Sequence, residues 1–209
     1  MFLASFLLLF GFANCDLTQY PVQRNYIYTY KAVTDQSPKR VIPILIDKRF
    51  SETDKRSLRG SISQWNYVLN SQMLLEVVDL DFTVPNNILD NPPKNVFIIR
   101  MVSNNSSELK DEPFEKCKKN DSCTLAWVNG IGGTVANIIR DRIADKDVAP
   151  IALHEIGHML YLSHVENRDM LMYPKYEHSN YLCVEKDSAI KVARQYHLDE
   201  NSLNYCQLI

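Results

Sequence analysis

The chain has 209 residues, of which 45% are hydrophobic and 23% are charged, and its net charge is −2. This composition is typical of a single globular domain, and the chain shows no repeats or low-complexity segments. The near-neutral charge argues against nucleic acid or an anionic membrane as a partner, and we expect a monomer. A basic stretch at 48–59 is interrupted by acidic residues, and we interpret it as a solvated helix face.

The N-terminus has the features of a targeting segment. Residues 1–15 carry no charge, are mostly apolar and are too few to span a bilayer. We predict a signal peptide cleaved after Ala13 or Cys15, although the usual basic residues are missing; a buried helix is the alternative. Residues 16–38 are polar and aromatic, which predicts an irregular N-terminal extension. The catalytic domain would then span 39–209, in a secreted, extracellular protein.

The first half of this domain predicts a strand, a helix and further strands. Residues 40–47 form an apolar run that predicts a short strand. Ser51, with Asp54 three residues later, predicts a helix start with an approximate capping box. Apolar residues then recur at helical spacing and predict a core-facing stripe, at Leu58, Ile62, Trp65, Val68 and Leu69. Later apolar segments predict strands at 74–82, 95–102, 123–128 and 134–140.

The last third of the chain predicts two helices. Residues 147–162 form a helical pattern, with Asp147 as the expected N-cap and Pro150 in the first turn. A final helix covers about 184–197. The order of strand, helix, several strands, helix and helix indicates one α+β domain.

The cysteine count supports an oxidising compartment. The chain has five cysteines, and cleavage after Cys15 would leave an even number. Four cysteines allow three connectivities, and we predict the local pairs Cys117–Cys123 and Cys183–Cys206. Free thiols in a cytosolic protein are the alternative.

Three asparagines lie in N-x-S sequons within polar loops, which agrees weakly with secretion. These candidate glycosylation sites are Asn104, Asn105 and Asn120.

The chain's five histidines are distributed unevenly, because three of them lie in HEIGHMLYLSH, residues 154–164. Residues four apart share one face of a helix, so His154 and His158 can point at one metal ion. Zinc accepts nitrogen ligands in a tetrahedral array, and a catalytic site keeps one position for water. Glu155 lies beside these ligands, where a carboxylate can take the proton of that water.

The third histidine constrains the chain path. A straight helix would carry His164 about 9 Å beyond His158. It can reach the same ion only if the helix ends and the chain turns back. Two surface histidines on an amphipathic helix are the alternative interpretation of the short HExxH pattern alone.

HEIGHMLYLSH resembles the zinc-binding motif HExxHxxGxxH of the metzincin clan of metalloproteases. MLMYPKY, residues 170–176, resembles the Met-turn of the matrixin family, at that family's distance from the third histidine. The resemblance implies an α+β, metzincin-like zincin catalytic domain. Such a domain has a twisted mixed sheet, an active-site helix, a Met-turn and a C-terminal helix.

The resemblance also implies roles for single residues. One catalytic Zn²⁺ would be bound by His154, His158 and His164. Glu155 would be the general base, and Met172 would form an apolar floor beneath the metal. Pro174 and Tyr176 would wall the S1′ pocket, which takes the side chain after the scissile bond. The stretch AWVNGIGGTVANIIR, residues 126–140, lies where such domains place an edge strand that pairs with an extended substrate.

Several positions depart from the family's pattern. Tyr161 stands where the motif has glycine, and a left-handed tyrosine costs roughly 1–2 kcal/mol. Either the chain bears this strain or it turns differently. Val165 replaces the serine that follows the third matrixin histidine. Pro174 stands where the similar astacins have a tyrosine, which favours the matrixins.

Other family parts are not recognisable in the sequence. The cysteine-switch motif and the histidines of the matrixin structural zinc site are missing. Three aspartates, Asp141, Asp145 and Asp147, either bind Ca²⁺ or belong to a charged connecting loop, and we favour the loop.

We therefore predict a secreted zinc endopeptidase that hydrolyses protein or peptide substrates. One alternative is a catalytically impaired metzincin that serves as a secreted protein-binding module. Another is a disulfide-stapled binding module whose histidines hold no metal.

Overall fold

The computed structural model describes residues 13–17, 26–28, 38, 40–109, 123–176 and 182–208. A seven-stranded sheet has the order β4-β3-β5-β7-β6-β1-β8, and a two-stranded sheet pairs β2 with β9. The strands of the large sheet, in that order, are Met73–Asp79, Arg40–Ile46, Phe97–Val102, Val135–Ile139, Thr124–Val128, Ala13–Leu17 and Lys175–Tyr176. The small sheet consists of Tyr26–Tyr28 and Cys206–Leu208.

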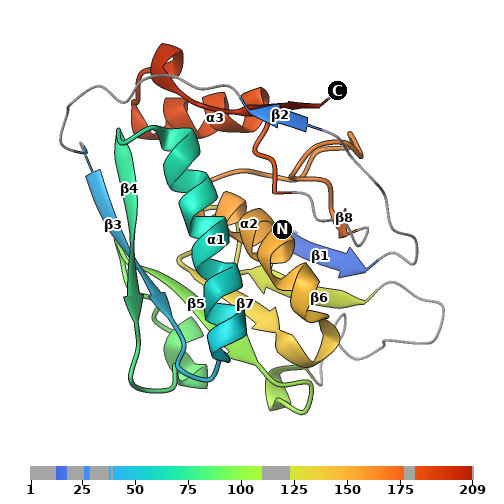
Figure 1. The fold of residues 1–209 in the computed structure, drawn as a ribbon. Coiled ribbons are helices and arrows are strands. Elements are labelled where there is room, and N and C mark those ends of the chain that lie inside the picture. Colours follow the sequence, from blue (N-terminus) through green and yellow to red (C-terminus); the bar gives the residue numbers. More distant parts are fainter. Residues whose placement is uncertain are drawn as a thin grey trace, which may run out of the picture.

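Three α-helices accompany the sheets: α1 (Glu52–Leu69), α2 (Val148–Met159) and α3 (Lys186–Tyr196). Helices α1 and α2 lie side by side against the large sheet, and α3 lies at one end of the domain (Figure 1). Short 3-10 turns occur at Asn86–Leu89, Ser107–Leu109, Arg140–Arg142, Asp145–Asp147 and Glu200–Ser202. In the part of the chain that the structure describes, no helix is both long enough and apolar enough to cross a membrane.

The large sheet is mixed. Strands β4, β3, β5 and β7 all run parallel to one another. Strand β6 is antiparallel to β7. The sheet and helices fit the predicted α+β, metzincin-like fold, which is thereby confirmed. β6 pairs with β7 on one side and with β1 on the other, and β1 in turn pairs with β8.

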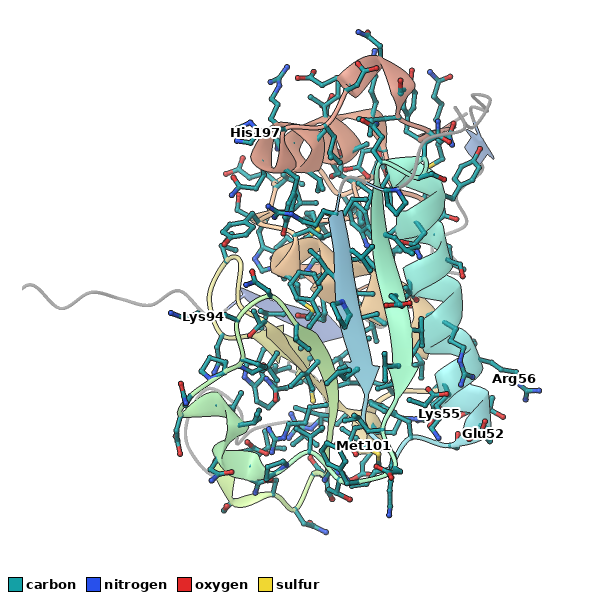
Figure 2. The ribbon with its side chains drawn as sticks, turned by 90° about the vertical axis from the view of Figure 1, so that its left-hand side faces the viewer. Glu52, Lys55, Arg56, Lys94, Met101 and His197 are labelled. Carbon is teal, nitrogen blue, oxygen red and sulfur yellow. A yellow bond between two sulfur atoms is a disulfide. The ribbon has the colours of Figure 1, made fainter. Side chains whose placement is uncertain are left out.

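Helix α1 begins as predicted. The Ser51 hydroxyl accepts from the backbone of Asp54 at 3.1 Å, and the Asp54 carboxylate accepts from the backbone of Ser51 at 3.2 Å. Charged side chains near this end, including Lys55 and Arg56, point away from the sheet (Figure 2). Trp65 is fully buried, as its place in the apolar stripe predicts.

Two hydrogen bonds fasten α1 to α2. The Trp65 indole N–H donates to the carbonyl of Leu153 at 3.0 Å. The Ser61 hydroxyl donates to the carbonyl of Ala149 at 2.7 Å. Both acceptors lie on α2 before its histidines, and Leu153 directly precedes His154, so α1 holds the N-terminal part of that helix in place.

Some predicted boundaries are wrong. The strand predicted at 74–82 ends at Asp79, and the helix predicted to reach 162 ends at Met159. The prediction of an irregular chain from 16 to 38 is also wrong, because the segment contains the end of β1 and all of β2. Both strands pair with partners more than a hundred residues away, which local sequence patterns do not reveal.

The C-terminal segment is held by a disulfide. Cys183 and Cys206 are both buried and are joined, so β9 is linked to the segment before α3. Cys123 is also disulfide-bonded. Cys117 lies outside the described residues, so the pair Cys117–Cys123 stays a prediction.

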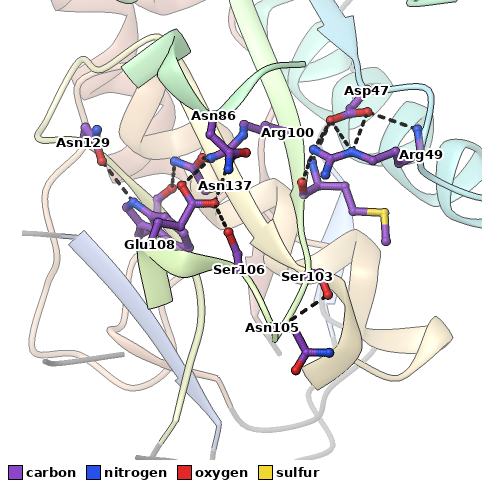
Figure 3. A network of polar contacts seen from close by, with 12 residues as sticks. Asp47, Arg49, Asn86, Arg100, Ser103, Asn105, Ser106, Glu108, Asn129 and Asn137 are labelled. Carbon is purple, nitrogen blue, oxygen red and sulfur yellow. Dashed lines mark hydrogen bonds and ion pairs between the residues drawn. The ribbon is translucent and has the colours of Figure 1, made fainter. Parts of the chain in front are cut away.

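A buried arginine connects several strands and turns (Figure 3). Arg100 on β5 is fully buried. Its guanidinium donates to both oxygens of Glu108, at 2.9 and 2.7 Å, and to the amide oxygens of Asn137 and Asn86, at 2.8 and 2.6 Å. These contacts tie β5 to β7 and to two connecting turns, so the cation organises this end of the domain.

Replacing this cation should destabilise the domain strongly. Arg100→Met leaves a carboxylate and two amides without their buried partner, and we expect the free energy of unfolding to fall by about 3–5 kcal/mol. Urea denaturation, monitored by circular dichroism, measures this change in the free energy of unfolding. Arg194→Met, in the exposed pair with Glu200, is the control and should leave the midpoint almost unchanged. Equal shifts for the two variants would contradict the assigned role of Arg100.

Candidate metal centre

Three histidine nitrogens meet at the end of α2. His154 and His158 lie one turn apart on this helix, and their Nε2 atoms are 3.0 Å apart. The Nε2 atom of His164 lies 3.3 and 3.1 Å from these two atoms. Among the described residues, these histidines are the only group of three or more His, Cys, Asp or Glu side chains whose ligand atoms lie close enough to bind one metal ion.

The chain turns back at Tyr161. This residue has a φ of 71°, in the left-handed region. The backbone N–H of Tyr161 donates to the carbonyl of His158 at 3.1 Å, and that of Leu162 donates to the carbonyl of Gly157 at 2.9 Å. These two bonds form a Schellman helix end, in which glycine is the usual left-handed residue. The chain therefore bears the strain of a left-handed tyrosine, roughly 1–2 kcal/mol.

Backbone carbonyls fix the orientation of two of the rings. The Nδ1 atom of His154 lies 2.7 Å from the carbonyl oxygen of Leu171, and that of His158 lies 2.7 Å from the carbonyl oxygen of Leu162. A carbonyl oxygen can only accept, so each Nδ1 carries the hydrogen. Each Nε2 lone pair is then free, and the ring presents it to the shared point between the histidines.

Burial keeps these rings neutral. It lowers the pKa of His154 well below its ordinary value, and the neighbouring His158 and His164 lower it further. Burial lowers the pKa of His158 to about 4 and also lowers the pKa of His164. At neutral pH the three imidazoles are therefore uncharged, and their Nε2 atoms lie within 3.3 Å of one another, an arrangement that a cation between them would stabilise.

The spacing of the nitrogens fits zinc. Tetrahedral zinc with nitrogen ligands at 2.0–2.1 Å places those nitrogens about 3.3–3.4 Å from one another. The observed separations of 3.0–3.3 Å lie close to this value. With three ligands from the protein, such a site keeps its fourth position for water or substrate.

Glu155 adds a buried carboxylate to the site. It follows His154 on α2, and its side chain is fully buried. Neither carboxylate oxygen has a hydrogen-bond partner among the described residues, and burial raises the pKa of this group well above its ordinary value. Burying a charged carboxylate without a partner costs free energy. A proton on the carboxyl group, or a hydrogen-bond donor such as a water molecule, would remove much of this cost.

The Met-turn packs directly against the metal-site helix. Met172 is buried, and a Cβ added to Gly157 would lie 2.6 Å from its sulfur. Gly157 therefore allows a close approach between the two segments, despite the cost of about 1 kcal/mol for glycine within a helix. A glycine between two such histidines is the sequence signal for this contact.

Glu185 supports the same turn. Its carboxylate accepts from the backbone N–H of Leu171 at 3.2 Å and from the hydroxyl of Ser188. The carbonyl of Leu171 is the acceptor for His154. Sequence reasoning missed this role of Glu185, because nothing in its neighbourhood indicates that it reaches a turn 14 residues earlier.

The remaining pocket candidates lie next to this turn. Pro174 is half-buried, and Tyr176 on β8 is buried. The Tyr176 hydroxyl donates to the Asp147 carboxylate at 2.9 Å, immediately before α2. The segment after the Met-turn is thereby tied to the start of the metal-site helix.

The other candidate residues have separate environments. Asp141 accepts from Ser103 and from the backbone of Asn104, whereas Asp145 pairs with Arg140. With Asp147 engaged by Tyr176, the three aspartates contact different partners. Asn104 and Asn105 are exposed, whereas Asn120 lies outside the described residues.

Comparison with protein families agrees with this geometry. The matrixin family model matches residues 97–197, from the first residue of β5 to the residue after α3. A comparison with curated proteins found no match. The matched segment contains the three histidines, Glu155 and the Met-turn. The match to residues 97–197, together with the fold, supports a metzincin-type, matrixin-like zinc-metallopeptidase domain.

Proposed function

We propose that this protein is a secreted zinc endopeptidase. The observation that carries the proposal is the convergence of three neutral imidazoles at the end of the helix that carries Glu155, a buried carboxylate with no hydrogen-bond partner in the described part of the chain. The zinc ligands would be His154, His158 and His164. Protein or peptide chains are the substrates that the family implies. Met172 would support the metal site from below, and Pro174 and Tyr176 would wall the pocket for the side chain after the scissile bond.

The proposed chemistry divides between the metal and Glu155. A bound zinc ion would act as a Lewis acid, lowering the pKa of water and polarising the peptide carbonyl. The Glu155 carboxylate accepts the proton of the attacking water. It then donates this proton to the leaving amine nitrogen. Its burial suits both steps, because a raised pKa allows the carboxylate to hold a proton between them.

The backbone of β1 indicates how a substrate would lie. β1 lies between β6 and β8 and runs antiparallel to β6 and parallel to β8. Ala13 pairs with Val128, and Leu17 pairs with Tyr176. An extended peptide in this position would form backbone hydrogen bonds on both sides, as in β-strand addition. We propose that the substrate takes this course.

Cleavage of a signal peptide during secretion would remove part of β1 from the proposed substrate position. We propose that residues 1–15 are a signal peptide, that 16–38 form an extension and that 39–209 form the catalytic domain. Removal of residues 1–15 takes away the part of β1 that pairs with β6 from 126 to 128. Disulfides and glycosylation at Asn104, Asn105 or Asn120 would suit the same compartment. A monomer remains the expected state.

Glu155→Gln should abolish cleavage without releasing the metal. The amide has the shape of the carboxylate but cannot accept the proton, so we expect kcat to fall by about 10²–10⁴-fold. Zinc content by mass spectrometry and cleavage of a denatured protein measure the two effects. Unchanged cleavage would exclude Glu155 as the base. A wild-type protein that binds zinc without cleaving would instead favour a protein-binding module.

His164→Ala should weaken zinc binding by removing one of three ligands. We expect the purified variant to lose zinc during dialysis against a chelator concentration that wild type withstands. The matched control is His197→Asn, because His197 lies exposed at the end of α3 (Figure 2). Its left-handed φ of 56° is tolerated by asparagine. Equal zinc retention in His164→Ala and wild type would remove His164 from the ligand set.

The N-terminal segment should compete with substrate while it is attached. A tethered strand has an effective concentration of about 1 mM, so we expect residues 1–209 to show a KM at least roughly tenfold above that of residues 16–209. Both forms are produced by refolding and assayed with the same extended peptide. Identical KM values would show that β1 does not share the course of the substrate.

A further inference from the structure

Two exposed apolar residues lie near the end of β6, one in the connection to β7 and one at the end of α2. Ile131, in the connection from β6 to β7, is 43% exposed, and Tyr161 is 48% exposed. They are two of the five large hydrophobic residues that are exposed in the described part of the chain. The other three are Val41, Val78 and Phe82, which lie on or near β3 and β4 at the far side of the large sheet.

The Tyr161 ring lies directly on this connection. A Cβ added to Gly132 would come within 2.3 Å of a ring carbon of Tyr161. The backbone N–H of Gly132 donates to the carbonyl of His158 at 2.8 Å, the same oxygen that accepts from Tyr161. The ring, the connection and the end of α2 therefore form one unit next to a candidate zinc ligand.

A second aromatic ring supports Tyr161 from α3. The ring centroids of Tyr161 and Tyr196 are 6.2 Å apart, in an edge-to-face arrangement. The guanidinium of Arg40 lies 5.2 Å from the centre of the Tyr196 ring. Tyr161 is thus held in place while nearly half of its surface remains open to solvent. A surface that is already ordered costs little conformational entropy when it binds a ligand.

The direction of β1 relates this pair to the substrate course. Because β1 is antiparallel to β6, its first residue, Ala13, lies beside Val128, at the end of β6 from which the connection to β7 begins. A peptide on the same course would place its residues on the N-terminal side of the scissile bond beside Ile131 and Tyr161. The opposite end of that peptide would lie along β8.

The strained backbone of Tyr161 gives an independent argument. Glycine would complete the helix end at lower conformational cost, since the left-handed region is freely accessible to it. A strained residue is retained only where the surrounding structure holds it, and such residues cluster at binding and catalytic sites. Here the strain places an aromatic ring at the end of the substrate course.

We propose that Ile131 and Tyr161 form a subsite that selects a large apolar side chain on the N-terminal side of the scissile bond. This inference rests on the proposed peptidase function and names a preference within it. The occupant is the side chain of an extended peptide whose backbone pairs with β6. Tyr161 contributes a supported aromatic face, and Ile131 contributes the adjoining aliphatic surface.

Paired peptides test the subsite. Each pair differs by leucine or serine at one position before the cleaved bond, and kcat/KM is compared within the pair. We expect wild type to prefer leucine at one such position by roughly five- to tenfold, since a favourable aromatic contact is worth about that factor. Tyr161→Gly should reduce this preference to about one. It should leave the preference after the cleaved bond unchanged.

Two further variants sharpen the test. Ile131→Ser should weaken the same preference, whereas Phe82→Ser, at an equally exposed residue beside β4, should retain it. Thermal denaturation confirms that each variant is folded. A leucine preference that survives in Tyr161→Gly, or a Phe82→Ser variant that loses it, would overturn the subsite.

A binding measurement separates this inference from the peptidase proposal. Zinc-loaded Glu155→Gln, with and without Tyr161→Gly, is titrated with the leucine and serine peptides of each pair. We expect the single variant to bind one leucine peptide more tightly and the double variant to bind both alike. This result would support the subsite even if wild type cleaved nothing. Equal binding of both peptides by the single variant would exclude the subsite.

Discussion

The metal centre depends on a sharp reversal of the chain at the end of α2. Without it, His164 would continue along the helix axis and leave its partners. The reversal is a Schellman turn with Tyr161 in the left-handed region, and the N–H of Leu162 closes it on Gly157. The carbonyl of Leu162 is also the acceptor for His158. One residue thus closes the helix end and orients a candidate ligand.

A second set of contacts supports the centre from the C-terminal side. The Glu185 carboxylate holds the N–H of Leu171, and the carbonyl of Leu171 orients His154. Met172 then packs against Gly157, between the two helical histidines. Both histidines therefore depend on backbone carbonyls from segments that follow α2. The position of these segments sets the geometry of the nitrogens.

Local patterns in the sequence predicted the elements that carry the site. The capping box at Ser51 and the apolar stripe through Trp65 predicted α1, and the helical pattern at 147–162 predicted the site helix. The sequence left two possibilities at Tyr161, because propensity alone does not decide whether a tyrosine accepts a left-handed turn. The roles of Glu185 and the pairing of β1 arise from long-range contacts, which lie beyond the reach of local patterns.

The zinc coordination itself is the most direct test of this account. Zinc-edge X-ray absorption on purified protein, with the zinc content counted per chain, reports the number and type of ligand atoms. The account predicts one zinc per chain, with three imidazole nitrogens at about 2.0–2.1 Å and one oxygen from water. Fewer than three imidazoles, or a protein that takes up no zinc, would contradict it.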